Sequence, residues 1–84
     1  MYELLISKKA EREIEKLPFE IQDKIFEALL DIRQDPYFGK PLTEEYEGYF
    51  SYKIGVYRII YKINEKDKKV FISTAGHRSI VYQY

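Results

Sequence analysis

The spacing of apolar residues changes once along this chain, and that change constrains the fold more than any other feature. Up to Gln34, apolar residues recur every three or four positions, which is the period of amphipathic helices. From Tyr49 onward they alternate with polar residues, which is the period of a strand with one buried face. The 84 residues suffice for one domain, residues 1–84. The sequence therefore predicts an α+β fold, with two helices packed on one face of a sheet.

The N-terminal half is expected to form a short strand and then an antiparallel pair of helices. The strand is Tyr2–Ile6, and Ser7 follows it with a hydroxyl that can cap a helix N-terminus. The first helix is expected over Lys8–Leu17, before Pro18 interrupts it. The second helix is Phe19–Gln34, and the Asp-Pro pair after it stops it. Residues 37–48 are expected to form a loop that contains an acidic cluster.

A two-residue hairpin loop sets the register of the sheet. Gly55-Val56 fits a type II′ turn, because glycine supplies the positive φ at the first loop position. Lys53 and Arg58 would then lie opposite each other on one face. The other face, expected to pack on the helices, carries the apolar residues of both strands: Phe50, Tyr52, Ile54, Tyr57, Ile59 and Tyr61. Like charges directly across a ladder are destabilising, which suggests that an anion binds between them.

A third strand, Val70–Ala75, is expected to end at Gly76 and to complete a three-stranded antiparallel meander. Strict alternation would turn one set toward the helices: Val70, Ile72 and Thr74. It would leave the other set on the charged face: Phe71, Ser73, Ala75 and His77. Arg78, Tyr82 and Tyr84 follow at the end of the chain. Cations beside aromatic rings suit phosphate binding with stacking on bases.

The charges are divided unevenly between the two halves of a chain whose net charge is zero. Residues 1–50 carry seven Lys/Arg and twelve Asp/Glu, whereas residues 51–84 carry seven Lys/Arg and two Asp/Glu. This division favours one basic working face, and the alternative is chance in a chain rich in Lys and Glu. For the Lys53–Arg58 pair, the alternative to an anion site is a solvated face, on which the two side chains extend into water or pair with Glu45 or Glu47.

Composition narrows the classes of protein further. With no Cys and one His, neither disulfides nor a structural zinc site is expected, and no cofactor is predicted. No apolar run approaches the ~20 residues that span a bilayer. Met1 leads directly into a strand, so no signal peptide is expected, and the cytoplasm is the default location.

Two segments resemble the RelE/ParE toxin superfamily: YFSYKIGVYRIIYKI and, after a charged turn, VFISTAGHRSIVY. The helical hairpin with its Lys16-Leu17-Pro18 turn also matches, so the resemblance covers nearly the whole chain. It implies a microbial RNase-like fold and membership of a type II toxin–antitoxin pair. RelE-type members cleave messenger RNA in the ribosomal A site, whereas ParE-type members inhibit DNA gyrase.

The resemblance also implies site residues. By position, the basic and catalytic residues of RelE-type members fall on Lys53, Arg58, Arg78 and Tyr82. The family position two before Lys53 often holds another cation, and here it is Ser51. In a metal-independent reaction, the 2′-OH of the RNA would attack the adjacent phosphorus and leave a 2′,3′-cyclic phosphate. That reaction needs a base, an acid and a group that stabilises negative charge.

Each candidate residue has an expected role. Arg58 would stabilise the developing phosphate charge, and Arg78 would share that role. Tyr82 is a candidate general acid or base, a stacking platform, or part of the core. Lys53 could act as a base only where neighbouring cations favour its neutral form. His77 titrates near neutrality without help, but it can equally fix the turn after Gly76. The expected RNA contacts are Lys53, Lys62, Phe71 and Tyr84.

Three functions remain open at this point. The first is a ribosome-dependent endoribonuclease, the second a ParE-like inhibitor of DNA gyrase, and the third a non-toxic member of a repressor complex. All three imply a cognate antitoxin as partner, and the first adds the ribosome and messenger RNA. Operator DNA would be bound only through the antitoxin, and no membrane contact is expected.

Overall fold

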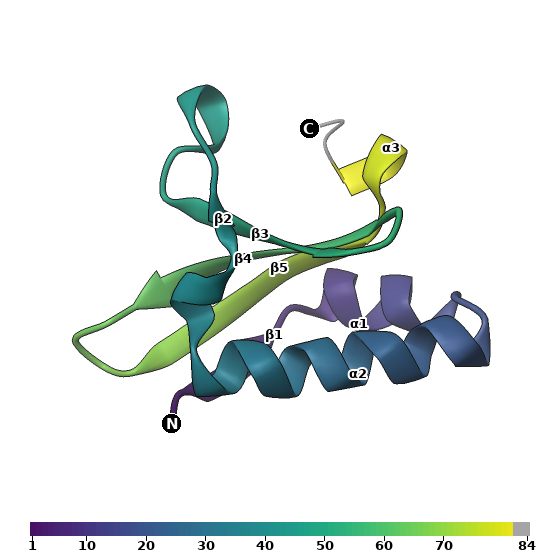
Figure 1. Ribbon diagram of the computed structural model, residues 1–84, viewed down its shortest axis with the longest axis horizontal. Coiled ribbons are helices and arrows are strands. Elements are labelled where there is room, and N and C mark those ends of the chain that lie inside the picture. Colours follow the sequence, from purple (N-terminus) through teal and green to yellow (C-terminus); the bar gives the residue numbers. More distant parts are fainter. Residues whose placement is uncertain (82–84) are drawn as a thin grey trace.

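The computed structural model describes residues 1–81, which form a twisted five-stranded sheet with α1 and α2 beneath one of its faces (Figure 1). The strands are β1 (Glu3–Ile6), β2 (Lys40–Pro41), β3 (Tyr49–Ile54), β4 (Tyr57–Asn64) and β5 (Lys69–His77). The helices are α1 (Lys8–Glu15), α2 (Phe19–Gln34) and α3 (Arg78–Val81), with 3₁₀ turns η1 (Pro36–Phe38) and η2 (Glu44–Tyr46). Within residues 1–81, no helix combines the length and apolar character that crossing a bilayer requires.

The strand order is β1-β5-β4-β3-β2, with β1 parallel to β5 and the other neighbours antiparallel. The α+β fold, the helical hairpin and the central meander are therefore confirmed. β1 adds a parallel edge strand to that meander, and β2 adds a short antiparallel one within the expected loop. On the face away from α1 and α2, η2 and α3 rise at separate places along the sheet (Figure 1).

The core lies between the two long helices and the sheet. Ser7 caps α1 as predicted, since its Oγ accepts from the Ala10 backbone N at 3.0 Å, although α1 ends at Glu15 and not at Leu17. The buried core cluster comprises Ala10, Ile14, Ile25, Ala28, Leu29, Ile32, Ile59, Tyr61, Val70, Ile72 and Ala75. The rest of the expected core face packs against this cluster partly buried: Phe50, Tyr52, Ile54 and Tyr57. The predicted register of the hairpin is thus confirmed from its buried side.

A β-bulge in β5 reverses which side chains face the helices. Ile60 pairs with Thr74 while the next residue, Tyr61, pairs with Ile72, so Ser73 is an extra residue in the ladder. One extra residue shifts the alternation by one, and every later side chain of β5 changes face.

The strict alternation expected for the third strand is therefore wrong beyond the bulge. Thr74 lies on the face away from the long helices, whereas Ala75 belongs to the core cluster. His77 pairs with Tyr57 and so shares the helix-facing side, not the charged side. The expected end of the strand at Gly76 is also wrong, because β5 continues to His77. Phe71, before the bulge, lies on the charged face as predicted, since it pairs with Lys62.

The edge of β5 is protected along its length by two different elements. β1 pairs with β5 only as far as Ile72. Beyond that point, the carboxylate of Glu13 on α1 accepts from Thr74 Oγ1 at 2.6 Å and from the Ala75 backbone N at 3.3 Å. Polar groups at a strand edge invite pairing with other chains unless they are occupied, so Glu13 continues the protection that β1 begins.

Tyr61 anchors the segment by which the chain leaves α2. Its hydroxyl donates to the Pro36 carbonyl oxygen at 2.6 Å, and burial raises the pKa of Tyr61 to about 12. Gly39 lies so close that an added Cβ would fall 2.2 Å from Tyr61 Oη. The η1 segment is therefore held tightly against β4.

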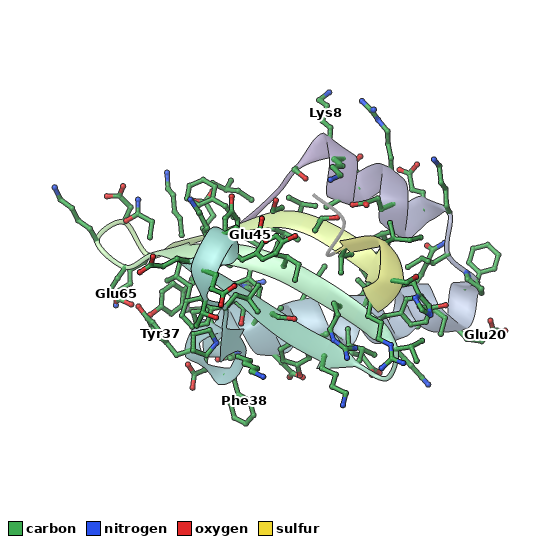
Figure 2. The ribbon with its side chains drawn as sticks, turned by 90° about the horizontal axis from the view of Figure 1, so that it is seen from above. Lys8, Glu20, Tyr37, Phe38, Glu45 and Glu65 are labelled. Atoms are coloured by element: carbon green, nitrogen blue, oxygen red, sulfur yellow. The ribbon has the colours of Figure 1, made fainter. Side chains whose placement is uncertain are left out.

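At the other end of the sheet, Glu65 ties three segments together. The hydroxyls of Tyr2 and Tyr37 both donate to Glu65 Oε1, at 2.6 and 2.8 Å, and Lys68 binds Oε2. Figure 2 labels Tyr37 and Glu65 at this end of the sheet. The hydrogen bond from Lys68, followed by those from the two tyrosines, lowers the pKa of Glu65 to about 2. The N-terminal strand, η1 and the β4–β5 turn therefore share one carboxylate.

We predict that Gly39→Ala lowers the free energy of unfolding by about 1–3 kcal/mol, because the new methyl group overlaps the Tyr61 hydroxyl. Urea denaturation measures the loss. Gly76→Ala is the control, since its Cβ would meet only Val81 Cγ1, at 3.6 Å, an ordinary contact. In a Tyr61→Phe background, the Gly39→Ala cost should fall to less than half. Equal costs in both backgrounds would contradict the steric explanation.

We also predict that the Glu65 cluster contributes stability above pH 4.5, and that this contribution is lost as the pH falls from 4.5 toward 2. The sign follows because the folded-state pKa of Glu65 lies below the ordinary glutamate value of 4.5, so the unfolded chain binds more protons in that window. Glu65→Gln should flatten the urea midpoint between pH 2 and 5 relative to the wild type. Glu20→Gln on α2 is the exposed control, and an unchanged acid slope in Glu65→Gln would refute the linkage.

Candidate anion-binding face

The hairpin places two cations side by side on the face away from the long helices. β3 and β4 pair Lys53 with Arg58 and Ile54 with Tyr57, as the sequence predicts. Gly55 has a φ of 58°, which is the positive value required at the first loop position. The like-charge pair is therefore a real feature of the sheet, and no single-residue slip relieves it.

Arg58 is oriented by the turn itself. Its Nη1 donates to the Gly55 carbonyl oxygen at 2.7 Å and to the Tyr57 carbonyl oxygen at 2.9 Å. Its Nη2 and Nε donate to nothing among residues 1–81. A guanidinium presents five N–H donors in a planar fork, so the free edge can still grip a phosphate oxygen pair.

Carboxylates do not neutralise the pair in the described part of the chain. Neither Glu45 nor Glu47 forms an ion pair with Lys53 or Arg58 there, although both were expected as alternative partners. The ammonium of Lys53 is exposed. The face therefore offers uncompensated positive charge at the hairpin.

The end of β5 adds a third cation near the same corner. Gly76 pairs with Arg58, so no side chain of β5 stands beside the guanidinium. Arg78, two residues later, begins α3, and its backbone N donates to the Val56 carbonyl oxygen at 2.8 Å. The backbone positions of Lys53, Arg58 and Arg78 thus meet at one end of the sheet, and the side chain of Arg78 is exposed.

A cleft of about 250 Å³ lies beside the hairpin on the same face. Ile60, two residues along β4 from Arg58, and its partner Thr74 line the floor, while η2 and α3 form opposite sides. Its lining residues are Lys9, Glu45, Tyr46, Tyr49, Ile60, Ser73, Thr74 and Val81. The bulge is what brings Thr74 to this lining.

The far end of this face carries the other expected contacts. Lys62 pairs with both Tyr49 and Phe71, and its Nζ lies 4.6 Å from the centroid of the Tyr49 ring. Phe71 is 42% exposed, and with Lys62 it lines a second groove of about 310 Å³. Lys62 and Phe71 thus share the face of Lys53 and Arg58, as expected.

His77 lies elsewhere. Its ring meets the Tyr57 ring edge-on at 6.0 Å between centroids, and its Nδ1 accepts from the Ser79 backbone N at 3.1 Å. This is the turn-fixing arrangement that the sequence left open as the alternative to catalysis. Tyr82 and Tyr84 lie outside the described residues. Within residues 1–81, no three His, Asp or Glu side chains are grouped to hold a metal ion.

One cation of this face was missed by sequence reasoning. β2 pairs Lys40 with Ser51, so Lys40 stands on the charged face directly beside the serine that replaces the expected cation. Ser51 is itself buried, at 7% exposure. The only sequence feature that could have indicated the β2 strand was Pro41, but proline occurs both in edge strands and in loops.

Comparison with known proteins agrees with this architecture. The sequence profile described as ParE toxin of the type II toxin–antitoxin system, parDE, matches residues 4–82. The chain belongs to the RelE/ParE toxin superfamily. The toxin RelG of Mycobacterium tuberculosis is 34% identical over 84 residues, which cover 98% of this chain and 97% of that protein. The toxin RelE of the same organism is 31% identical, over 98% of this chain and 87% of its own length.

Solved structures of superfamily toxins share the fold. The crystal structure of the RelBE2 toxin–antitoxin complex from M. tuberculosis contains a chain that matches with a TM-score of 0.85 at 34% identity. The match covers 92% of this toxin and 98% of that chain. The isolated E. coli RelE toxin matches with a TM-score of 0.78 at 23% identity, over 98% of this toxin and 92% of that chain, which shows the fold alone.

We predict that Lys53→Thr raises the free energy of unfolding of this superfamily toxin by about 0.2–1 kcal/mol, because it removes a like charge opposite Arg58. The gain should shrink as salt is added, since salt screens exposed charges. Urea denaturation at low and high salt measures both effects. Lys66→Thr, in the turn at the far end of β4, should change stability little. If Lys53→Thr instead lowered the free energy of unfolding, Lys53 and Arg58 would not repel each other enough to destabilise the fold.

Proposed function

We propose that this toxin is a ribosome-dependent endoribonuclease that cleaves messenger RNA and so inhibits translation. The observation that carries the proposal is the uncompensated Lys53–Arg58 pair, on the same face as an open cleft that Ile60 lines two residues along β4 from Arg58. A phosphodiester is the anion that such a pair suits, because Arg binds two phosphate oxygens while Lys adds a point charge.

In the proposed reaction, a base removes the proton of the RNA 2′-OH, and the oxygen attacks the adjacent phosphorus. The bond to the 5′-oxygen breaks, that oxygen takes a proton from an acid, and a 2′,3′-cyclic phosphate remains. Arg58 stabilises the charge that develops on the phosphate oxygens, and Arg78 assists from the start of α3. Tyr82 is proposed as acid or base, and Lys53 binds the phosphate with its positive charge.

The proposal names partners as well. The RelBE2 complex of M. tuberculosis and the RelBE complex of E. coli each hold a toxin with its antitoxin, which supports a cognate antitoxin here. The ribosome and messenger RNA would be the targets, and cytoplasmic action follows from that choice. Operator DNA would be reached only through the antitoxin.

A second candidate is inhibition of DNA gyrase through protein contacts alone. The observation in its favour is that the matching profile is that of ParE toxins. In that case Arg58 and Arg78 would serve partner binding, and no phosphodiester would be cleaved.

The test is induced expression in a bacterial host, with mapping of messenger RNA ends. We expect cuts inside translated frames, and a loss of about 10²–10³ in cleavage rate on ribosomes for Arg58→Ala. Because Arg58 also binds the turn carbonyls, Arg58→Lys and a denaturation curve for each variant separate charge from folding. Lys24→Ala on α2 is the control, and it should cleave like the wild type.

Growth arrest with intact transcripts and reduced supercoiling would contradict the nuclease and favour the gyrase candidate. Cleavage by a folded Arg58→Ala variant at the wild-type rate would remove Arg58 from the mechanism.

A further inference from the structure

Phe38 is a large apolar side chain left in solvent by a rigid segment. It is 79% exposed and projects from the edge of the molecule (Figure 2). Its neighbours are fixed: the Asp35 carboxylate accepts from the Tyr37 backbone N at 3.1 Å, and the Tyr37 ring meets Phe50 edge-on at 5.8 Å. With the Tyr61–Pro36 hydrogen bond and the close approach at Gly39, the backbone on both sides of Phe38 is held in place.

This ring forms one wall of a groove of about 300 Å³ at the β2–β3 edge. The groove is lined by Phe38, Gly39, Lys40, Ser51, Tyr52 and Lys53. β2 pairs Lys40 with Ser51, and continuing that register would bring Phe38 opposite Lys53, where the chain instead leaves the sheet as η1. The ring and the Lys53 side chain therefore border the same space.

The charges around the ring differ between its two sides. In the groove, Lys40 and Lys53 form no ion pair with any carboxylate within residues 1–81. On the other side, Phe38 borders a separate groove of about 380 Å³ that holds Asp31 and Asp35. Those carboxylates are engaged, since Asp31 accepts from the Tyr52 hydroxyl at 3.0 Å and Asp35 caps η1. A polyanion is therefore favoured on the lysine side only.

We propose that Phe38 is a stacking platform for an unpaired RNA base, with Lys40 and Lys53 binding the phosphates that flank that base. An exposed aromatic ring beside unpaired cations is the arrangement by which proteins hold single-stranded nucleic acid. Because its backbone is fixed before binding, little ordering cost opposes the stack. The proposal rests on RNA as the ligand of this face, and it extends the RNA path from the Lys53–Arg58 pair to the β2 edge.

The chain contains no Trp, so Phe38→Trp creates a single tryptophan at the platform, which can be excited selectively at wavelengths that the nine tyrosines do not absorb. Phe19→Trp is the matched control, because Phe19 on α2 is 81% exposed and belongs to the helical layer. Each full-length variant is titrated with an oligoadenylate that carries 2′-O-methyl groups and so cannot be cleaved by 2′-OH attack. Inorganic polyphosphate is the second probe, which offers phosphate without bases.

We expect oligoadenylate to quench the Phe38→Trp variant and to leave the Phe19→Trp variant unchanged, while polyphosphate quenches neither. Phe38→Ala should weaken oligoadenylate binding by about 5- to 100-fold, the range measured for one stacked base. Phe38→Tyr should restore it. Equal quenching of both reporters, or equal quenching by polyphosphate, would overturn the stacking assignment.

A parallel cleavage assay separates this inference from the proposed nuclease. In that assay Phe38→Ala should raise KM and leave kcat near the wild-type value. Wild-type cleavage with unchanged KM in Phe38→Ala would refute the platform and leave the nuclease standing. Quenching without any cleavage by the wild type would support the platform and refute the nuclease. Weaker binding of a copurified antitoxin, with RNA binding unchanged in Phe38→Ala, would assign the ring to a protein contact and refute the platform.

Discussion

The extra residue at Ser73 is the constraint on which both faces of this sheet depend. Without it, Ala75 would leave the core and Thr74 would enter it, so the end of β5 would present a hydroxyl to the long helices. With it, the helix-facing side stays apolar from Val70 to Ala75, and Gly76 comes to lie opposite Arg58. One shift of register therefore completes the core and also clears the space beside the guanidinium.

The hairpin contains a repulsion between two cations, which hydrogen bonds to the backbone partly compensate. Lys53 and Arg58 repel each other across the ladder, and neither has a carboxylate partner among the described residues. Arg58 instead donates from one nitrogen to two carbonyl oxygens of the turn, which stabilises the hairpin and leaves its other nitrogens without a partner among the described residues. In the proposed function, an RNA phosphate bound between the two side chains would remove this repulsion.

The sequence predicted those features of the fold that a particular residue type marks, and it missed those that no residue type marks. Gly55 has to adopt positive φ, so the turn, the Lys53–Arg58 register and the buried face of the hairpin followed from pattern alone. The bulge has no comparable mark, because a serine in a strand looks the same whether paired or extra. His77 was misplaced for that reason. Lys40 was missed because a two-residue strand is too short to show any period.

The division of charge along the chain does not become a simple division between layers in space. α1 carries three acidic and three basic residues, and α2 carries four acidic and two basic residues, so the helical layer is only weakly acidic. On the opposite face, Lys40, Lys53 and Arg58 stand on β2, β3 and β4, whereas the acidic cluster lies at η2, which rises from the same face. A chain of zero net charge can therefore present a local basic patch, and an approaching polyanion is steered to that patch and not to the whole face. A net charge of zero therefore does not weaken the case for RNA. The orientation of an approaching RNA depends on where the charges lie on the surface, whereas the net charge governs only the attraction at long range. Lys40 enlarges this basic patch, because it comes from the acidic half of the chain but pairs with Ser51 on the face of Lys53 and Arg58.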